Sequence, residues 1–251
     1  MANGRDDPRF FTVSGEAWTK GLSVCRARRA DSTATHNIQG ARDRLIRLAA
    51  TNSEWALGFE DECWWSGFAQ PAPHAFSEAG EPMRLIRQTP AKDDPDPKAL
   101  CAYGMLVRST EPDGEADLLE RVFLRFVDGR PVSSITTRFL DWSCQRLQRM
   151  GKKALLLIRD NASWHKSREV EDWIALHNRA VNDGGSGVRI VSRLLPTKSP
   201  WLNPIEPMWI HGKRKVIEPD GLLGAYELAD RVCGVFGCEH ESHLSIDQEV
   251  A

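Results

Sequence analysis

Three acidic residues occupy positions where a carboxylate could do chemistry, and Asp61 is the first. It lies in WALGFEDECWW, where alternate residues from Leu57 to Cys63 would share one face of a strand. A carboxylate on a core-facing position is costly unless it is paired or binds a metal. An edge strand would instead leave Asp61 solvated, and that alternative stays open. Glu60 and Glu62 would point to the other face, as solvated or supporting residues.

Asp160 is the second acid, and it follows the apolar run ALLLI at 154–158. Such a run is typical of a strand buried on both faces. Sites in α/β sheets collect at the carboxyl ends of strands, where Asp160 and Asn161 would lie. Either residue could instead only shape the turn. Ser167 is expected to cap the helix that follows.

Glu206 is the third acid, within LPTKSPWLNPIEPMW. Asn203 fits the position before a helix, and Pro204 fits its first turn. This spacing resembles a capping box with Asn in place of Ser or Thr, so Glu206 could serve only to satisfy a backbone N–H. A carboxylate offers several lone pairs, however, and capping leaves room for a second role.

Together the three acids indicate more than each does alone. One acid on a core strand, one at the end of a second strand and one on a later helix can converge on a small volume. Hard oxygen ligands suit Mg²⁺ or Mn²⁺. Two such ions can activate a hydroxyl and stabilise the leaving oxygen of an in-line phosphoryl displacement. We therefore predict that Asp61, Asp160 and Glu206 are both catalytic residues and metal ligands.

The segments around these acids resemble a known family. DNASWHKS at 160–167, followed by LLPTKSPWLNPIEPMW at 194–209, resembles the signature of the IS630 family of bacterial transposases, which is related to the Tc1/mariner group. FEDECWW at 59–65 resembles the first acidic motif of that family, and WIHGKRKVIEP at 209–219 also fits. The resemblance covers about residues 41–245.

The resemblance implies a fold and a reaction. The fold would be α/β, an RNase H-like mixed β-sheet flanked by helices, with a DDE triad of Asp61, Asp160 and Glu206. Two Mg²⁺ or Mn²⁺ ions would serve cleavage of transposon-end DNA and transfer of the freed 3′-hydroxyl to target DNA. The partners would be double-stranded DNA, both transposon ends and target, and a second copy in a homodimer.

Two features depart from the family. The gap between Asp160 and Glu206 is longer than in the best-known mariner relatives, and NDGGSG at 182–187 would hold the extra residues in a loop. Family members carry helix-turn-helix modules before the catalytic domain, whereas only 60 residues precede Asp61 here. We therefore expect residues 1–50 to be a linker or a remnant of a DNA-binding region, and 51–245 to be the catalytic domain.

Two alternatives to an active transposase remain at this stage. The chain could be a truncated, inactive remnant that folds or binds DNA non-specifically without catalysis. It could also be a general RNase H-like nuclease acting on other DNA or RNA.

The rest of the sequence predicts the elements that position these residues. Strands come first and then alternate with helices, which favours a mixed sheet with helices on its faces. A helix over 131–150 is expected to start with Pro131. The expected strands are 55–65, 83–87, 99–107, 121–127, 154–158 and 188–195, and the other expected helices are 41–50, about 167–181, one from 203 and about 224–237.

Charge and composition limit the class of protein. With 33 basic and 35 acidic residues the net charge is -2, whereas a protein that coats DNA would be strongly basic. DNA contact must then be local, although a solvated helix end that complements its dipole is the alternative for the last turn of the helix from 203. The expected DNA-contacting residues are His165, Lys166, Lys198, Lys213, Arg214 and Lys215.

The location follows from what the sequence contains. Six scattered cysteines favour free thiols in a reducing compartment. No apolar run approaches transmembrane length, and the first residues lack the apolar stretch of a signal peptide. These features predict a cytoplasmic, nucleoid-associated protein without a membrane partner.

Cys233, Cys238, His240 and His243 form a further candidate metal cluster. Their spacing, Cys-x4-Cys-x-His-x2-His, differs from that of a standard zinc finger, whose Cys and His pairs stand further apart. Apolar neighbours suggest that Cys233 packs within a helix. The sequence leaves open whether this cluster binds a metal.

Overall fold

The computed structural model describes residues 40, 43–44, 46–49, 51–67, 99–110, 118–196, 199–216 and 223–246. Of the helix expected at 41–50, residues 43, 44 and 46–49 are helical. The strand expected at 83–87 and Lys198 both lie outside the described residues. Among the helices that the structure describes, none is long and apolar enough to cross a membrane.

The elements follow the predicted order closely. The boundaries of each predicted strand and helix in the described ranges agree with the structure within a few residues. The strands are β1 (Trp55–Ser66), β2 (Ala99–Thr110), β3 (Leu118–Asp128), β4 (Ala154–Arg159), β5 (Arg189–Leu194) and β6 (Leu244–Ser245). The helices are α3 (Ser133–Arg149), α4 (Arg168–Gly184), the 3-10 helix η1 (Pro200–Leu202), α5 (Glu206–Val216) and α6 (Ala225–Phe236).

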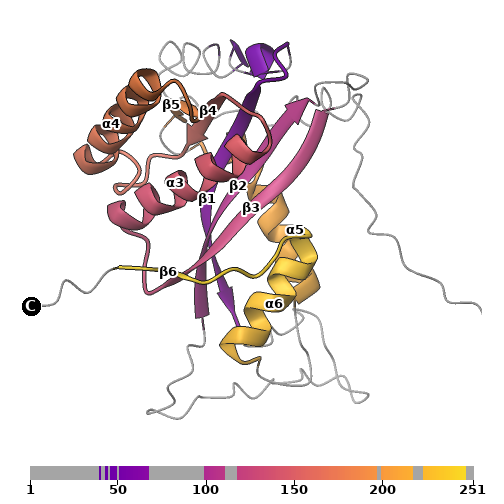
Figure 1. Cartoon of the computed structure of the whole chain (residues 1–251). Coiled ribbons are helices and arrows are strands. Elements are labelled where there is room, and N and C mark those ends of the chain that lie inside the picture. Colours follow the sequence, from indigo (N-terminus) through magenta and orange to yellow (C-terminus); the bar gives the residue numbers. More distant parts are fainter. Residues whose placement is uncertain are drawn as a thin grey trace, which may run out of the picture.

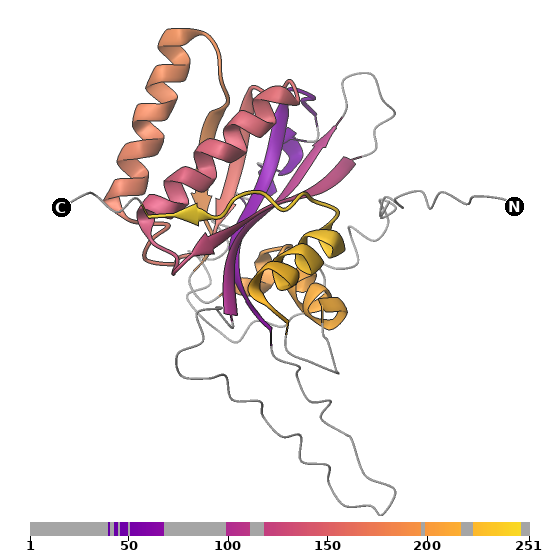
Figure 2. The same ribbon diagram turned by 60° about the horizontal axis from the view of Figure 1, so that its bottom comes forward.

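The strands form one mixed sheet in the order β5-β4-β1-β2-β3-β6. β1, β2 and β3 pair in antiparallel fashion, whereas β4 is parallel to both β1 and β5, and β6 is parallel to β3. Helices α3 and α4 cover one face of the sheet, and α5 and α6 cover the other (Figures 1 and 2). The predicted α/β architecture, a mixed sheet flanked by helices, is confirmed.

The central strand β1 is buried on both of its faces. Leu57, Phe59 and Cys63 belong to the core under α5 and α6, as the alternation predicted, and Ala56 belongs to the core under α3 and α4. Glu60 therefore points into a covered face, and it is fully buried. Of the two roles we considered for Glu60, solvated or supporting, the solvated one was wrong, because helices cover the second face of the sheet as well.

Of two predicted helix starts, the one at Ser167 is confirmed and the one at Pro131 is wrong. Ser167 is the N-cap of α4, and its side chain accepts a hydrogen bond from the Val170 N–H, as expected. Helix α3 begins at Ser133 with Val132 as its N-cap, because Val132 has an extended backbone (φ -146, ψ 166). Pro131 therefore precedes the helix and does not start it.

Gly104 lets α5 lie directly on the sheet above Asp61. It pairs with Asp61 across β1 and β2. A Cβ atom at Gly104 would come within 2.6 Å of Cζ2 of Trp209 on α5. Trp209 is 3% exposed and packs edge-on against Trp65. The missing side chain thus makes room for the indole that contacts Asp61.

Gly104→Ala is expected to destabilise the fold by about 2 kcal/mol, because the atoms that a Cβ meets belong to a rigid buried indole. Denaturant unfolding measures the loss, and near-UV circular dichroism reports the displaced tryptophan. Gly184→Ala is the matched control, since a Cβ there meets nothing within 4 Å. Equal effects of the two substitutions would contradict the close approach of Trp209 to β2.

Candidate active site

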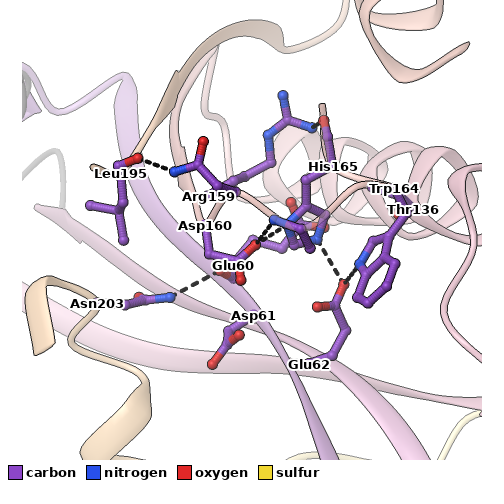
Figure 3. Close-up of polar contacts among 12 residues, drawn as sticks. Glu60, Asp61, Glu62, Thr136, Arg159, Asp160, Trp164, His165, Leu195 and Asn203 are labelled. Carbon is purple, nitrogen blue, oxygen red and sulfur yellow. Dashed lines mark hydrogen bonds and ion pairs between the residues drawn. The ribbon is translucent and has the colours of Figure 1, made fainter. Parts of the chain in front are cut away.

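The sheet register brings Asp61 and Asp160 to the same level. β1 and β4 pair in parallel from Trp55 with Ala154 to Phe59 with Ile158. Two further steps in this register place Asp61 beside Asp160, the first residue after β4. Both acids therefore stand where β4 ends and β1 continues (Figure 3).

Asp61 is a nearly buried acid with one hydrogen bond to α5. Asp61 is 7% exposed, and its Oδ2 accepts a hydrogen bond from Trp209 Nε1 at 3.0 Å. Burial, together with the nearby carboxylates of Glu206 and Glu62, raises the pKa of Asp61 to about 8 despite the opposing hydrogen bond from Trp209. Without a bound cation, Asp61 is therefore largely protonated at neutral pH.

Glu206 is the first residue of α5 and completes the group of acids. Burial raises the pKa of Glu206, the charge of Asp160 raises it further, and the charge of Lys213 lowers it. The charge of Glu206 also raises the pKa of Asp61, and the charge of Asp160 raises the pKa of both. The three carboxylates therefore lie close enough to interact electrostatically. The structure thus brings the three predicted acids into one neighbourhood.

The capping box predicted around Glu206 is not formed. The side-chain amide of Asn203 donates to the backbone oxygen of Glu60 at 3.1 Å, and Asn203 Oδ1 is buried without a hydrogen-bond partner. Asn203 therefore does not cap α5 with its side chain. It ties the start of α5 to β1, next to Asp61, so a tertiary contact replaces the local one.

Asp160 both shapes the turn after β4 and keeps its charge. Its Oδ1 accepts from the Ala162 N–H at 2.8 Å and contacts His165 Nδ1 at 2.7 Å. Burial alone would raise the pKa of Asp160, but these hydrogen bonds, together with the positive charges of His165 and Arg159, outweigh burial and lower it. The turn-forming interpretation was therefore right, and it holds Asp160 in the ionised state that a metal ligand needs.

His165 is the link between Asp160 and Glu62. Its Nε2 lies 2.7 Å from Glu62 Oε1, which also accepts from Trp164 Nε1 at 3.0 Å (Figure 3). Burial opposes protonation of the ring, but the hydrogen bonds to both carboxylates raise the pKa of His165 to about 10. An imidazolium thus bridges two carboxylates. The ring is fully buried and both of its nitrogens are engaged, so these contacts do not support the predicted DNA contact at His165, which stays a prediction.

Two further side chains hold the loop after β4 against β5. Arg159 donates through Nη1 to the His165 backbone oxygen at 2.8 Å and through Nη2 to Ser192 Oγ at 2.9 Å. The Asn161 side chain donates to the Leu195 backbone oxygen. The loop that carries Asp160 is therefore fixed from both sides, which preorganises its carboxylate.

Sequence reasoning described Glu60 and Glu62 only as solvated or supporting residues, and it missed Trp164. Glu60 is fully buried with both carboxylate oxygens unpaired, and burial raises its pKa to about 7 even though His165 and Arg159 act to lower it. Three consecutive acids on one strand were the available signal. Glu60 and Glu62 are on the face covered by α3 and α4, and Asp61 is on the face covered by α5, and all these helices come much later in the chain.

The side chains of Asp61, Asp160 and Glu206 offer the oxygen ligands that a hard divalent cation prefers. All three groups are carboxylates, and the charged groups that act most strongly on Asp61 are also carboxylates, so a cation bound there would relieve their mutual repulsion. Among the described residues, no group of three or more His, Cys, Asp or Glu side chains is arranged to hold a metal ion as it stands. The chemistry therefore fits an ion, although the carboxylates are not gathered around one point.

The predicted DNA-contacting lysines and arginine lie at the surface. Lys166 is exposed directly after the buried His165. Lys213, Arg214 and Lys215 are exposed in the last turn of α5, and Lys213 lies close enough to act on Glu206. Their contact with DNA stays a prediction.

Asp61→Asn is expected to stabilise the metal-free protein by about 3 kcal/mol near pH 8. The folded-state pKa of Asp61 is raised from 3.8 to about 8, so Asp61 costs the wild type stability as pH rises through that window, and the Asn variant lacks this contribution. Asn can still accept from Trp209. Urea unfolding in EDTA between pH 4 and 8 measures the difference, and a variant no more stable than the wild type at pH 8 would contradict the raised pKa.

Part of this chain matches a known protein family. Residues 119–220 match the family described as DDE superfamily endonuclease, and that range contains Asp160 and Glu206 but not Asp61. No curated protein matches the chain.

Solved structures of Mos1 transposase resemble the fold. The paired-end complex with the left transposon end is 13% identical, with a TM-score of 0.51, and the match covers 89% of this chain and 63% of that one. The Mos1 strand transfer complex is 11% identical, with a TM-score of 0.50 over 89% of this chain and 62% of that one. The chain thus spans less than two thirds of the Mos1 chains. The likeness establishes the fold, which is RNase H-like as predicted.

Proposed function

We propose that this chain is the catalytic domain of a DNA transposase, of the IS630 type, that cleaves transposon-end DNA and transfers the cut strand. The observation that carries the proposal is the neighbourhood of Asp61, Asp160 and Glu206, three carboxylates brought from β1, the end of β4 and the start of α5. The match of residues 119–220 to DDE superfamily endonucleases supports it.

The three carboxylates would hold Mg²⁺ or Mn²⁺, as two ions. When bound, such ions activate the attacking hydroxyl and stabilise the leaving oxygen. Asp160 enters the site ionised and oriented, since His165 and the Ala162 N–H fix its Oδ1. Asp61, whose pKa is raised to about 8, would have to give up its proton to serve as a ligand. Trp209 keeps one oxygen of Asp61 in place during this change.

The DNA partner follows from the same site. The related fold of Mos1 transposase is known in a paired-end complex with a left transposon end and in a strand transfer complex. For this chain we propose the same class of partner, double-stranded DNA at element ends and target, with Lys166, Lys213, Arg214 and Lys215 contacting phosphates. A homodimer would hold two ends together.

The test is cleavage of defined duplexes in Mg²⁺ or Mn²⁺. One duplex carries the terminal inverted repeat found in the DNA that flanks the gene, and the other is a random sequence of equal length. A transposase nicks the repeat end at a fixed position and leaves the random duplex largely intact. Equal cleavage of both would favour a general RNase H-like nuclease, and no cleavage of either would favour an inactive remnant.

A further inference from the structure

The segment that follows α6 carries two histidines away from the carboxylate site. It leaves the helix, runs along the sheet and ends in β6, which pairs with the end of β3 (Figure 1). His240 and His243 lie in this segment, on either side of Glu241 and Ser242. The ring of Phe126 on β3 packs against both histidines, with ring centroids 5.7 Å and 5.5 Å away.

The two imidazole rings face each other through their Nε2 atoms. His240 Nε2 lies 3.2 Å from His243 Nε2. The other nitrogen of each ring contacts a carboxylate: His240 Nδ1 lies 3.0 Å from Asp230 on α6, and His243 Nδ1 lies 2.7 Å from Asp128 at the end of β3. The side chains of His240 and His243 are 11% and 21% exposed, so both rings are mostly shielded from water.

These contacts leave the facing nitrogens as electron-pair donors. An ionised carboxylate only accepts hydrogen bonds, so each Nδ1 carries the proton of its neutral ring. Each Nε2 of a neutral ring then presents a lone pair to the other. Two facing lone pairs repel, and the arrangement needs a cation between them, which is either one shared proton or a metal ion.

The geometry suits a metal ion. Two Zn–N bonds of about 2.1 Å that span this 3.2 Å separation enclose an angle of roughly 100°, between the octahedral and tetrahedral values. Histidine ligands of metals commonly donate their second N–H to a carboxylate, which orients the ring and makes it more basic. Asp230 and Asp128 stand in that position here.

We propose that His240 and His243 form a second metal site, for a borderline transition-metal ion such as Zn²⁺. Imidazole nitrogens select such an ion, whereas the carboxylate site suits Mg²⁺ or Mn²⁺. No group of three such ligands exists among the described residues, so water completes the coordination. Cys238 does not take part, because its thiol contacts the Cys233 backbone oxygen. The bound ion would fasten the segment before β6 to α6 and β3.

Calorimetric titration of the whole chain with Zn²⁺, in excess Mg²⁺ to occupy the carboxylates, tests this site. The wild type is expected to bind one equivalent that His240→Gln and His243→Gln each lose. Asp230→Asn and Asp128→Asn should weaken binding by about 10–100-fold while retaining the ligands. His211→Gln, on the exposed face of α5, and Asp61→Asn should leave that equivalent unchanged.

Two outcomes would overturn the proposal. One is Zn²⁺ binding that is unaffected by both histidine substitutions in variants shown to be folded by circular dichroism. The other is a wild type that binds no Zn²⁺ at this site, because a shared proton would then occupy the gap between the rings. The Asp230→Asn and Asp128→Asn variants keep the test decisive if a histidine variant fails to fold.

Discussion

Asp61→Asn is expected to lower metal-dependent DNA cleavage by about 10³-fold or more, since loss of a ligand removes several kcal/mol of transition-state stabilisation. Asn keeps the shape of the side chain and an acceptor for the Trp209 N–H, so the loss reports charge and not packing. Asp160→Asn and Glu206→Gln should show losses of similar size. Single-turnover cleavage of a labelled end duplex measures all three.

The matched controls for these substitutions are acids outside the site. Asp172 on α4 and Glu227 on α6 form exposed ion pairs with residues one turn away, and their amide variants should cleave at the wild-type rate. If any one of the three site variants retained wild-type cleavage, that residue would be removed from the proposed catalytic group.

His165→Ala should have the second largest effect, a loss of about 3–5 kcal/mol of stability at neutral pH, because it leaves Glu62 and Asp160 without their shared cation. Equilibrium unfolding in urea measures this loss. His211→Ala, at an exposed position on α5, is the control and should change stability little.

The effect of His165 should also depend on pH in one direction. The pKa of His165 is raised from 6.5 to about 10 in the folded protein, so the folded state holds the proton more tightly. The stabilisation is complete below pH 6.5 and is lost as pH rises toward 10. The difference between wild type and His165→Ala should shrink over that window. A difference that grows with pH would contradict an imidazolium between two carboxylates.

The alternation of residues in a single strand was enough to predict that Asp61 is an acid on a core-facing position of β1. Leu57, Phe59 and Cys63 set the period of β1, and an acid in phase with them stood out. Asp160 and Glu206 each had a local explanation, as a turn former and as a helix cap, so their assignment leaned on the resemblance of the surrounding motifs to a known family. Sequence reasoning therefore predicted the order of the elements correctly, whereas the catalytic and metal-binding roles of the three acids stay predictions.

The supporting contacts could not be predicted in this way because they join distant segments. Glu62 and His165 are 103 residues apart, and Asn203 and Glu60 are 143 apart. Sequence reasoning gave His165 as a DNA-contacting residue and Asn203 as a helix cap. Each side chain instead contacts β1, because the sheet and the helices on both its faces enclose that strand.

Asp61 is the residue on which the account depends most. The family match includes Asp160 and Glu206, whereas the place of Asp61 rests on the register between β1 and β4 and on its interaction with Glu206. A direct test must therefore ask whether Asp61 shares a cation with the other two acids.

Electron paramagnetic resonance of Mn²⁺ titrated into the protein answers that question, with His243→Gln as the background so that the histidine pair cannot contribute. We predict that this protein binds Mn²⁺ and that adding Asp61→Asn weakens binding at least about tenfold, as Asp160→Asn and Glu206→Gln also do. Mn²⁺ binding of equal strength with and without the Asp61 carboxylate would contradict a metal site built from these three residues.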